Sequence, residues 1–386
     1  MAVERDVVEE TFENTPTGVE VELDEEQPEE PKPWDPEKVR VSTRQYSLRN
    51  ILDMIDDGDV ELAPDFQRNE VWTPRQRSRL IESIILEIPL PAFYFADDKN
   101  GVKKVVDGLQ RLSTVRAFVR LKAFPLKGLE YLSGSEGKKF DELLPVIRRR
   151  INGAQITAHI IDPTTPSNVV YDIFKRINTG GSPLNAQEIR HCMSQPRSRE
   201  FLKRCAESEE FLLATANSMN KIRMHDREVV LRYCAFRLFG IEGKGGYASY
   251  KTLDAFLESM TDLLDDERGL PDDQLESLYD EFRSVMLKSH LIFGDQSFRK
   301  WPKEDPEKVT PGRRPINRPL FEAWSVVLSN FDESDLRIRK GSIVEAAREL
   351  MTTRREYDDA ITSGTGNIAK VKLRFGLTEE AARAGV

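Results

Sequence analysis

The sequence predicts an α+β protein in which a mixed α/β domain precedes a mostly α-helical region. Up to about residue 183, short strand-like segments bounded by turn residues alternate with apolar stripes at helical spacing. Beyond that point, helical periodicity dominates. A length of 386 residues suffices for two or three domains of ordinary size. We therefore expect a mixed domain at residues 40–195 and a helical domain at residues 196–386.

The first 39 residues differ in composition from the remainder of the chain. They contain fourteen Asp or Glu and three Lys or Arg, whereas residues 40–386 contain 52 acidic and 54 basic residues. Such a segment has few large apolar groups with which to offset its ordering entropy, so we expect residues 1–39 to be a disordered acidic tail. The tail would be a solubilising extension or, alternatively, a nucleic-acid mimic that shields a basic site.

Capping residues predict the first two helices. Ser47 is a suitable N-cap for a helix that Gly58 ends. Thr73 and Pro74 begin a second helix, and Pro89 follows it. The apolar faces of these helices carry Leu48, Ile51, Leu52 and Ile55 in the first, and Leu80, Ile81, Ile84, Ile85 and Ile88 in the second.

Strand signals surround these helices. Residues 60–62 are a short extended piece, and residues 92–96 and 102–106 flank a turn containing Asn-Gly, which predicts a β-hairpin. The second hairpin strand runs into a helix that begins near Asp107, and a further strand at 154–161 leads into a helix at 168–177. The C-terminal region predicts helices at 188–205, 227–239, 249–264, 273–287, 319–330 and 343–355.

Several protein classes are excluded by simple patterns. No apolar run of about 18 residues is present, which argues against a transmembrane helix. Three cysteines in so long a chain argue against a disulfide framework and favour a cytoplasmic location. The four histidines, at positions 159, 191, 225 and 290, do not pair at metal-ligand spacing. No phosphate-binding loop, dinucleotide-binding glycine motif, zinc-protease motif or histidine nuclease pattern is found.

The junction from Asp107 to Arg111 carries the strongest chemical signal. A strand that ends in Asp-Gly and turns into a helix presents free backbone N–H groups at the positive end of the helix dipole. Arg111 adds a guanidinium within the first turn, so the junction suits a phosphate. Asp107 could hold a divalent cation, and Gln110 could position a water molecule. The structural alternative is that Asp107 caps the helix and Arg111 forms an ion pair.

Two further clusters suggest anion binding. Gln67 and Arg68, followed by Trp72, lie between a Pro-Asp turn and a helix. Residues 174–184 contain two successive glycines, which can form a backbone nest for an anion beside Lys175 and Arg176. Each cluster has an ordinary structural alternative, a core tryptophan with a surface arginine in the first and a helix C-cap with a turn in the second.

These clusters occur together in an order that resembles a known family. The sequence is similar to the N-terminal domain of GmrSD-type modification-dependent restriction systems, which has a fold like ParB and sulfiredoxin. The resemblance covers roughly residues 45–195. It rests on 64–68 (PDFQR), Trp72, 80–84 (LIESI), 88–91 (IPLP), 106–114 (VDGLQRLST), 174–181 (FKRINTGG) and 184–189 (LNAQEI).

The resemblance implies nucleoside triphosphate binding, and often hydrolysis, at an Asp-Gly-Gln-Gln-Arg motif. The triphosphate would be GTP, UTP, CTP or ATP with Mg²⁺, which Asp107 would hold. Carried over by position, the catalytic set is Asp107, Gln110 and Arg111. The nucleotide-binding set is Gln67, Arg68, Gly108, Arg111, Ser113, Thr114, Lys175, Arg176 and Asn178.

Two departures from the family pattern matter. Leu109 stands where the family usually has its first glutamine, which predicts slow turnover if that amide orients the attacking water. The helical region offers no histidine nuclease site. We therefore expect an NTP-dependent sensor of an anti-phage restriction system, with DNA as a partner and cleavage supplied by a separate nuclease subunit.

Two other functions remain open from the sequence. A non-catalytic DNA-binding adaptor, or regulator of a partner nuclease, would use the three arginines at 148–150 and the basic loop at 299–318, which has seven basic residues, three acidic residues and four prolines. Alternatively, the ParB-like domain itself would cut DNA with Asp107 and either Glu82 or Glu188. The candidate DNA or partner contacts of the loop are Arg299, Lys300, Arg313 and Arg314.

Overall fold

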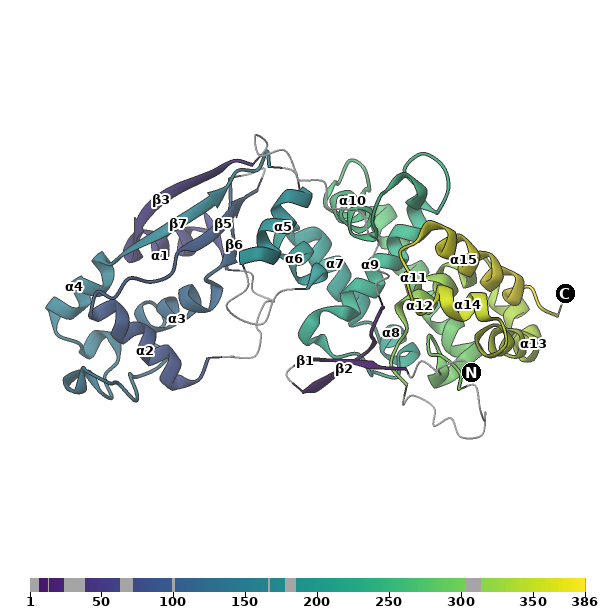
Figure 1. Ribbon diagram of the computed structural model, residues 1–386, viewed down its shortest axis with the longest axis horizontal. Coiled ribbons are helices and arrows are strands. Elements are labelled where there is room, and N and C mark those ends of the chain that lie inside the picture. The colour runs from purple at the N-terminus through teal and green to yellow at the C-terminus, as the bar shows by residue number, and fades with distance from the viewer. Residues whose placement is uncertain are drawn as a thin grey trace. The chain divides into compact units, whose positions relative to one another are not determined.

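The computed structural model describes residues 7–12, 14–23, 39–62, 72–98, 101–165, 167–177, 185–302 and 314–385. The chain divides into two compact units, whose elements are labelled in Figure 1. The mixed unit is Glu30–Leu184, and the helical unit combines Met1–Glu29 with Asn185–Val386. The predicted α+β class is confirmed, because one unit contains a sheet covered by helices and the other is mostly helical.

The mixed unit is built on a five-stranded sheet. Its strands are β3 (Val41–Ser47), β4 (Val60–Glu61), β5 (Phe93–Asp97), β6 (Lys103–Asp107) and β7 (Gln155–Ile161), and its α-helices are α1 (Leu48–Asp57), α2 (Pro74–Ile85), α3 (Leu109–Val119), α4 (Pro145–Gly153) and α5 (Ser167–Ile177). The strand order is β3-β7-β5-β6-β4. Strands β3 and β7 are antiparallel, as are β5 and β6, whereas the β7–β5 and β6–β4 pairs are parallel.

The predicted caps of the first two helices are confirmed. The hydroxyl of Ser47 accepts a hydrogen bond from the N–H of Asn50 (3.2 Å), and Gly58 ends α1 in the left-handed conformation. At α2, the hydroxyl of Thr73 and the side chain of Gln76 accept hydrogen bonds from each other's backbone N–H groups. Helix α2 ends at Ile85, earlier than its apolar stripe predicts, and Ile88 beyond it is half exposed.

Helices of the mixed unit cover one of the two faces of the sheet. Figure 1 shows α1 to α4 lying together on one side of the strands. The core on that side combines their apolar faces with strand residues that alternate along the chain, among them Phe93, Phe95, Ile156, Ala158 and Ile160. The residues between them point to the other face. That alternation decides which side chains surround the end of β6.

The helical unit has ten α-helices within its described residues. They are α6 (Ala186–Met193), α7 (Pro196–Ala206), α8 (Glu209–Ala214), α9 (His225–Phe239), α10 (Leu253–Asp265), α11 (Asp272–Phe293), α12 (Arg318–Leu328), α13 (Glu333–Thr352), α14 (Arg355–Ala360) and α15 (Ile368–Ala382). A large apolar core joins them around Trp324, Phe282 and Phe236. Cys192, Cys205 and Cys234 are buried free thiols. None of the described helices combines the length and the hydrophobicity needed to cross a membrane.

The predicted disordered tail is wrong for residues 7–12 and 14–23. This segment contains a hairpin of β1 (Glu9–Phe12) and β2 (Thr15–Glu20) that belongs to the helical unit. Val19 is fully buried in the core. On either side of it, the N–H of Glu20 donates a hydrogen bond to the carbonyl of Ile316 (2.9 Å), and the N–H of Ile316 donates one to the carbonyl of Gly18 (2.8 Å). Composition alone does not predict this ordered hairpin, because the residues that pair with its glutamates lie far away in the sequence.

Carboxylates of the N-terminal segment neutralise buried cations of the helices. Glu22 pairs with Arg232 (2.6 Å), and Glu20 pairs with Lys300 (2.6 Å). Glu10 contacts both His225 (3.1 Å) and Arg318 (3.1 Å). Burial disfavours the charge on Arg232, but Glu22 and the neighbouring carboxylates outweigh it and raise the pKa of Arg232 well above its ordinary value.

The boundary near residue 195 also differs from the expected one. Helix α6 packs against α9 and α10 of the helical unit, and Arg190 on α6 pairs with Asp254 (2.7 Å). The side-chain amide of Asn185 donates a hydrogen bond to the carbonyl of Arg223 (2.8 Å). The helical unit therefore begins at Asn185 rather than at residue 196.

Loss of one N-terminal carboxylate should destabilise the helical unit. We expect Glu22→Gln to lower its free energy of unfolding by about 3 kcal/mol, because it removes one of the carboxylates that neutralise the buried guanidinium groups of Arg232 and Arg318. The melting temperature should fall by roughly 6–12 °C in calorimetry. The matched control is Glu333→Gln, which breaks an exposed pair with Arg337 and should cost less than about 1 kcal/mol. Equal losses in the two variants would contradict this role.

The contribution of Glu10 should depend on pH. Burial opposes its ionisation, but hydrogen bonding and charge from His225, with the charge of Arg318, lower the pKa of Glu10 to about 2 from 4.5. Its stabilisation is therefore fully present above pH 4.5 and is lost as the pH falls toward 2. Urea unfolding of wild type and Glu10→Gln should show a stability difference that shrinks over this range. A difference that stays constant would exclude the coupling.

Candidate functional site

The turn from β6 into α3 depends on a glycine. Strand β6 ends at Asp107, and Gly108 has a φ of +99°, in the left-handed region. A Cβ atom at this position would overlap Cδ1 of Phe93 and lie 2.9 Å from Cε1 of the same ring. Both the backbone conformation and the close approach therefore require glycine here. The turn carries Asp107 and Arg111 from the strand onto the first turn of the helix.

Arg111 is held at this turn by several contacts. Its Nη2 donates hydrogen bonds to Oδ2 of Asp107 (2.6 Å) and to the carbonyl of Ala92 (3.2 Å), and its Nη1 donates to the carbonyl of Pro91. The guanidinium also lies over the ring of Phe93, 4.3 Å from the ring centroid. These contacts come from the strand, the helix and the segment before β5, so they fix the orientation of the guanidinium.

Arg111 keeps its positive charge in this position. Burial lowers the pKa of Arg111, and the carboxylate of Asp107 acts in the opposite direction. Its side chain is 12% exposed and that of Asp107 is 34% exposed, so the pair lies close to the surface of the mixed unit. The purely structural interpretation of this junction predicted that Arg111 forms an ion pair, and that ion pair is confirmed. The helix cap that it assigned to Asp107 is wrong, because Gly108 is the N-cap.

The start of α3 offers further donors. Gly108 supplies no side-chain cap, so no side chain at the N-cap position uses the first N–H groups of the helix. These groups, the positive end of the helix dipole and the Arg111 guanidinium meet at one turn. Together they can bind an anion such as a phosphate.

The structure brings together only part of the predicted nucleotide-binding set. Gln110 on α3 is partly buried, and Ser113 is exposed one turn later. Thr114, however, is 4% exposed, so its hydroxyl is poorly placed for a ligand. Arg176 is exposed on α5. Gln67, Arg68, Asn178 and the side chain of Lys175 lie outside what the structure describes.

Leu109 occupies the position at which the sequence departs from the family pattern. It is the first residue of α3, and its side chain is partly buried against the apolar core of the mixed unit. An apolar side chain there contributes to packing and provides no amide for a water molecule. Gln110 is thus the only amide of the predicted motif on this turn.

The carboxylates near this turn permit a simple metal site. Within the described ranges, no cluster of three or more His, Cys, Asp or Glu side chains is arranged to hold a metal ion. Asp107 uses Oδ2 for its bond to Arg111. Mg²⁺ is often bound by one or two carboxylates with phosphate oxygens and water, so a single aspartate beside a phosphate site fits the ion.

The two glutamates considered for DNA cleavage have structural roles. Glu82 is 4% exposed, and its carboxylate accepts backbone hydrogen bonds from Glu130, Tyr131 and Leu132, which hold the loop after α3. Glu188 forms a capping box with Asn185 at the start of α6. These contacts use carboxylate oxygens that a nuclease would need for metal ions.

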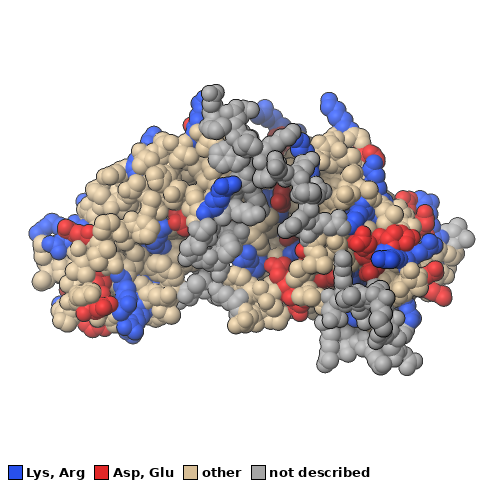
Figure 2. Space-filling view, viewed as in Figure 1, with Lys and Arg blue, Asp and Glu red and all other residues tan. Residues whose placement is uncertain are grey.

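The prediction that the basic loop is a DNA-binding surface is wrong for two of its residues. Arg299 is fully buried, and its guanidinium donates to the carbonyls of Arg314 (2.8 Å) and Thr215 (2.7 Å). Lys300 is 7% exposed and bonds Glu20. Arg314 is partly buried, and Arg313 lies outside the described residues. On the face in Figure 2, the Lys and Arg side chains that are drawn are scattered rather than gathered in one basic patch.

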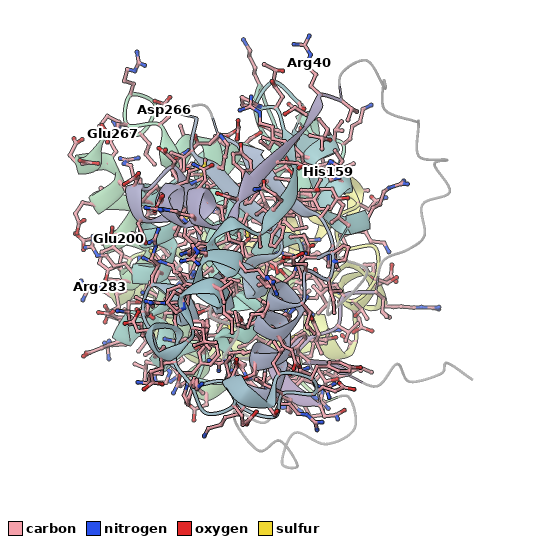
Figure 3. The ribbon with its side chains drawn as sticks, turned by 90° about the vertical axis from the view of Figure 1, so that its left-hand side faces the viewer. Arg40, His159, Glu200, Asp266, Glu267 and Arg283 are labelled. Atoms are coloured by element: carbon pink, nitrogen blue, oxygen red, sulfur yellow. The ribbon has the colours of Figure 1, made fainter. Side chains whose placement is uncertain are left out.

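Two aromatic residues beside the candidate site are not marked by any local motif in the sequence. Tyr94 on β5 is paired with Asp107 on β6, and with His159 on β7 (His159 is labelled in Figure 3). Their rings are in contact, with centroids 4.9 Å apart. Only the register of the three strands brings them together. The one sequence signal was the alternation of polar and apolar residues along β5 and β7.

Replacement of Gly108 should separate backbone strain from steric overlap. Gly108→Ala adds both the strain of a positive φ and the clash with Phe93, so we expect a loss of about 2–4 kcal/mol in the unfolding free energy. Gly101 also has a positive φ (+84°) but has nothing within 4 Å of a Cβ atom. The control Gly101→Ala should therefore cost only about 1–2 kcal/mol. Equal costs, measured by urea unfolding, would show that Phe93 does not constrain the turn.

Comparison with known proteins identifies the domain that carries this turn. Residues 48–194 match the family model of the GmrSD restriction endonuclease, N-terminal domain. A search of the curated proteins gave no match, and neither did a search of the solved structures. The matched segment contains the whole strand–turn–helix junction of Asp107 and Arg111 together with the aromatic pair. Residues 48–194 of this chain are therefore a domain of the GmrSD N-terminal family.

Proposed function

We propose that the chain binds a nucleoside triphosphate at the β6–α3 turn and hydrolyses it with Mg²⁺, as the sensor component of a modification-dependent restriction system. The family match supports a component of a GmrSD-like restriction system. The observation that carries the finer proposal is the position of Arg111. Its guanidinium is fixed at a helix N-terminus whose N-cap residue is a glycine, and it lies beside the partly exposed carboxylate of Asp107.

Each group at the turn has a distinct task in this proposal. Arg111 and the first N–H groups of α3 neutralise and orient the phosphates. Asp107 holds Mg²⁺, which supplies charge neutralisation at the phosphate oxygens when bound. Gln110 orients the attacking water. Leu109 offers no second amide for that step, so the proposal includes slow turnover.

DNA cleavage is assigned to a separate polypeptide. Glu82 and Glu188, the two glutamates considered for DNA cleavage, do not support an autonomous nuclease, since their carboxylates hold backbone N–H groups. The burial of Arg299 and Lys300 also removes support from a DNA adaptor that binds through the basic loop. In this proposal, the helical unit transmits the nucleotide state to the nuclease partner or to DNA.

Loss of Arg111 should weaken nucleotide binding. A charge-assisted hydrogen bond contributes about 1.5–3 kcal/mol, so Arg111→Ala should raise the dissociation constant roughly tenfold to a hundredfold in calorimetry with Mg²⁺ and each NTP. The matched control is Arg116→Ala on the same helix, because Arg116 pairs with Asp56 (3.2 Å) away from the turn. Unchanged affinity in a folded Arg111→Ala protein would refute the proposal.

Hydrolysis is tested with a variant whose side chain has the same shape as aspartate but carries no charge. Asp107→Asn should retain the fold and abolish Mg²⁺-dependent phosphate release, because it removes the carboxylate that holds the metal ion. Phosphate release and plasmid nicking are measured separately in the wild-type protein. Phosphate without nicks supports the sensor, and nicks by this chain alone would support a nuclease. Phosphate release that persists in Asp107→Asn would remove Asp107 from the mechanism.

A further inference from the structure

A row of paired residues crosses four strands of the sheet and ends at the candidate site. Thr43 on β3 is paired with His159 on β7, His159 with Tyr94 on β5, and Tyr94 with Asp107 on β6. Directly opposed residues of neighbouring strands lie side by side on the sheet. The β5–β6 register shifts between Tyr94 and Phe95. Such a bulge commonly re-aims a side chain beside a functional site.

The middle of this row is a fixed aromatic pair. The rings of Tyr94 and His159 have centroids 4.9 Å apart and planes inclined by 36°. Nδ1 of His159 shares a hydrogen bond with the hydroxyl of Thr43 (2.9 Å), which sets the orientation of the imidazole. Both rings are partly exposed, whereas their chain neighbours Phe93, Phe95, Ala158 and Ile160 are buried.

The aromatic pair is not part of the helix-covered core. The core beneath α1 to α4 contains Phe93, Phe95, Ala158 and Ile160, and it does not include Tyr94 or His159. Alternation along a strand places the pair on the opposite face. Two neighbouring aromatic rings that are fixed in position and partly exposed are a surface on which another flat ring can stack.

We propose that Tyr94 and His159 form the surface on which the nucleotide base stacks, while Arg111 and the start of α3 bind the phosphates. This inference rests on the proposed function. Neighbouring strands are about 4.8 Å apart, so His159 lies roughly 10 Å from Asp107 across β5. The sugar of the nucleotide passes over the end of the sheet, where β5 begins and β6 ends. The site thus binds a base-bearing triphosphate more tightly than a simple polyphosphate.

Stacking predicts a particular pattern of specificity. Every base has a π face, so stacking on aromatic side chains tolerates changes of base. Tyr94 and His159 therefore increase the affinity for all four nucleoside triphosphates and discriminate weakly among them. Inorganic tripolyphosphate, which lacks a base, binds through Arg111 and α3 alone.

The experiment compares these two ligands by calorimetry. Tyr94→Ala and His159→Ala should each weaken binding of ATP roughly tenfold to a hundredfold and leave tripolyphosphate binding unchanged. Tyr94→Phe, which keeps the ring, should bind ATP within about threefold of wild type. The control is Tyr131→Ala, since Tyr131 is 70% exposed on another part of the mixed unit. Thermal unfolding of each variant checks its fold.

The outcomes separate this inference from the function on which it rests. If the wild-type protein binds neither ATP nor tripolyphosphate, the proposed function fails. If wild type binds ATP and the folded Tyr94→Ala and His159→Ala proteins bind it equally well, only the stacking inference is overturned. Loss of both ligands in these variants would also overturn it, because the pair would then support the phosphate site rather than the base.

Discussion

The site depends on one steric constraint, the absence of a Cβ atom at Gly108. Because nothing projects from this position, the ring of Phe93 can lie against the turn, and β6 can pass directly into α3. The same ring lies beneath the guanidinium of Arg111. One core phenylalanine therefore sets both the backbone of the turn and the position of its cation. The geometry proposed to bind phosphate follows from core packing.

The helical unit depends on charges that come from the far end of the chain. Arg232 and Arg318 lie in its interior, and the N-terminal segment contributes Glu10 and Glu22 to them. The strongly acidic composition of residues 1–39 thus partly reflects carboxylates that neutralise buried arginines of the helices. The low isoelectric point says little about the ligands of this protein, because some of the charges that create it face each other inside the fold.

The features that were predictable are local in sequence. Ser47 and Gly58 bound α1, and Thr73 begins α2, because a cap acts within four residues of its own position. The Asp107–Arg111 turn was recognised for the same reason, through five consecutive residues. Strand β3 was missed because it is an edge strand whose side chains are mostly exposed, so it lacks an apolar pattern.

The features that were missed depend on distant partners. Lys300 is buried because it pairs with Glu20, which lies 280 residues away in the sequence. No local pattern distinguishes Lys300 from a surface lysine. Tyr94 and His159 come together through strand register, which a short window of sequence does not fix. The polar groups that the sequence misplaced or overlooked are those whose environment is created by tertiary structure.

The most direct test of the central claim is a structure of the protein with Mg²⁺ and a non-hydrolysable nucleoside triphosphate. The account predicts phosphate oxygens within hydrogen-bonding distance of the Arg111 guanidinium and the first N–H groups of α3, with the metal ion on Asp107. A triphosphate bound elsewhere, with the Asp107–Arg111 pair unchanged and free of ligand, would contradict it.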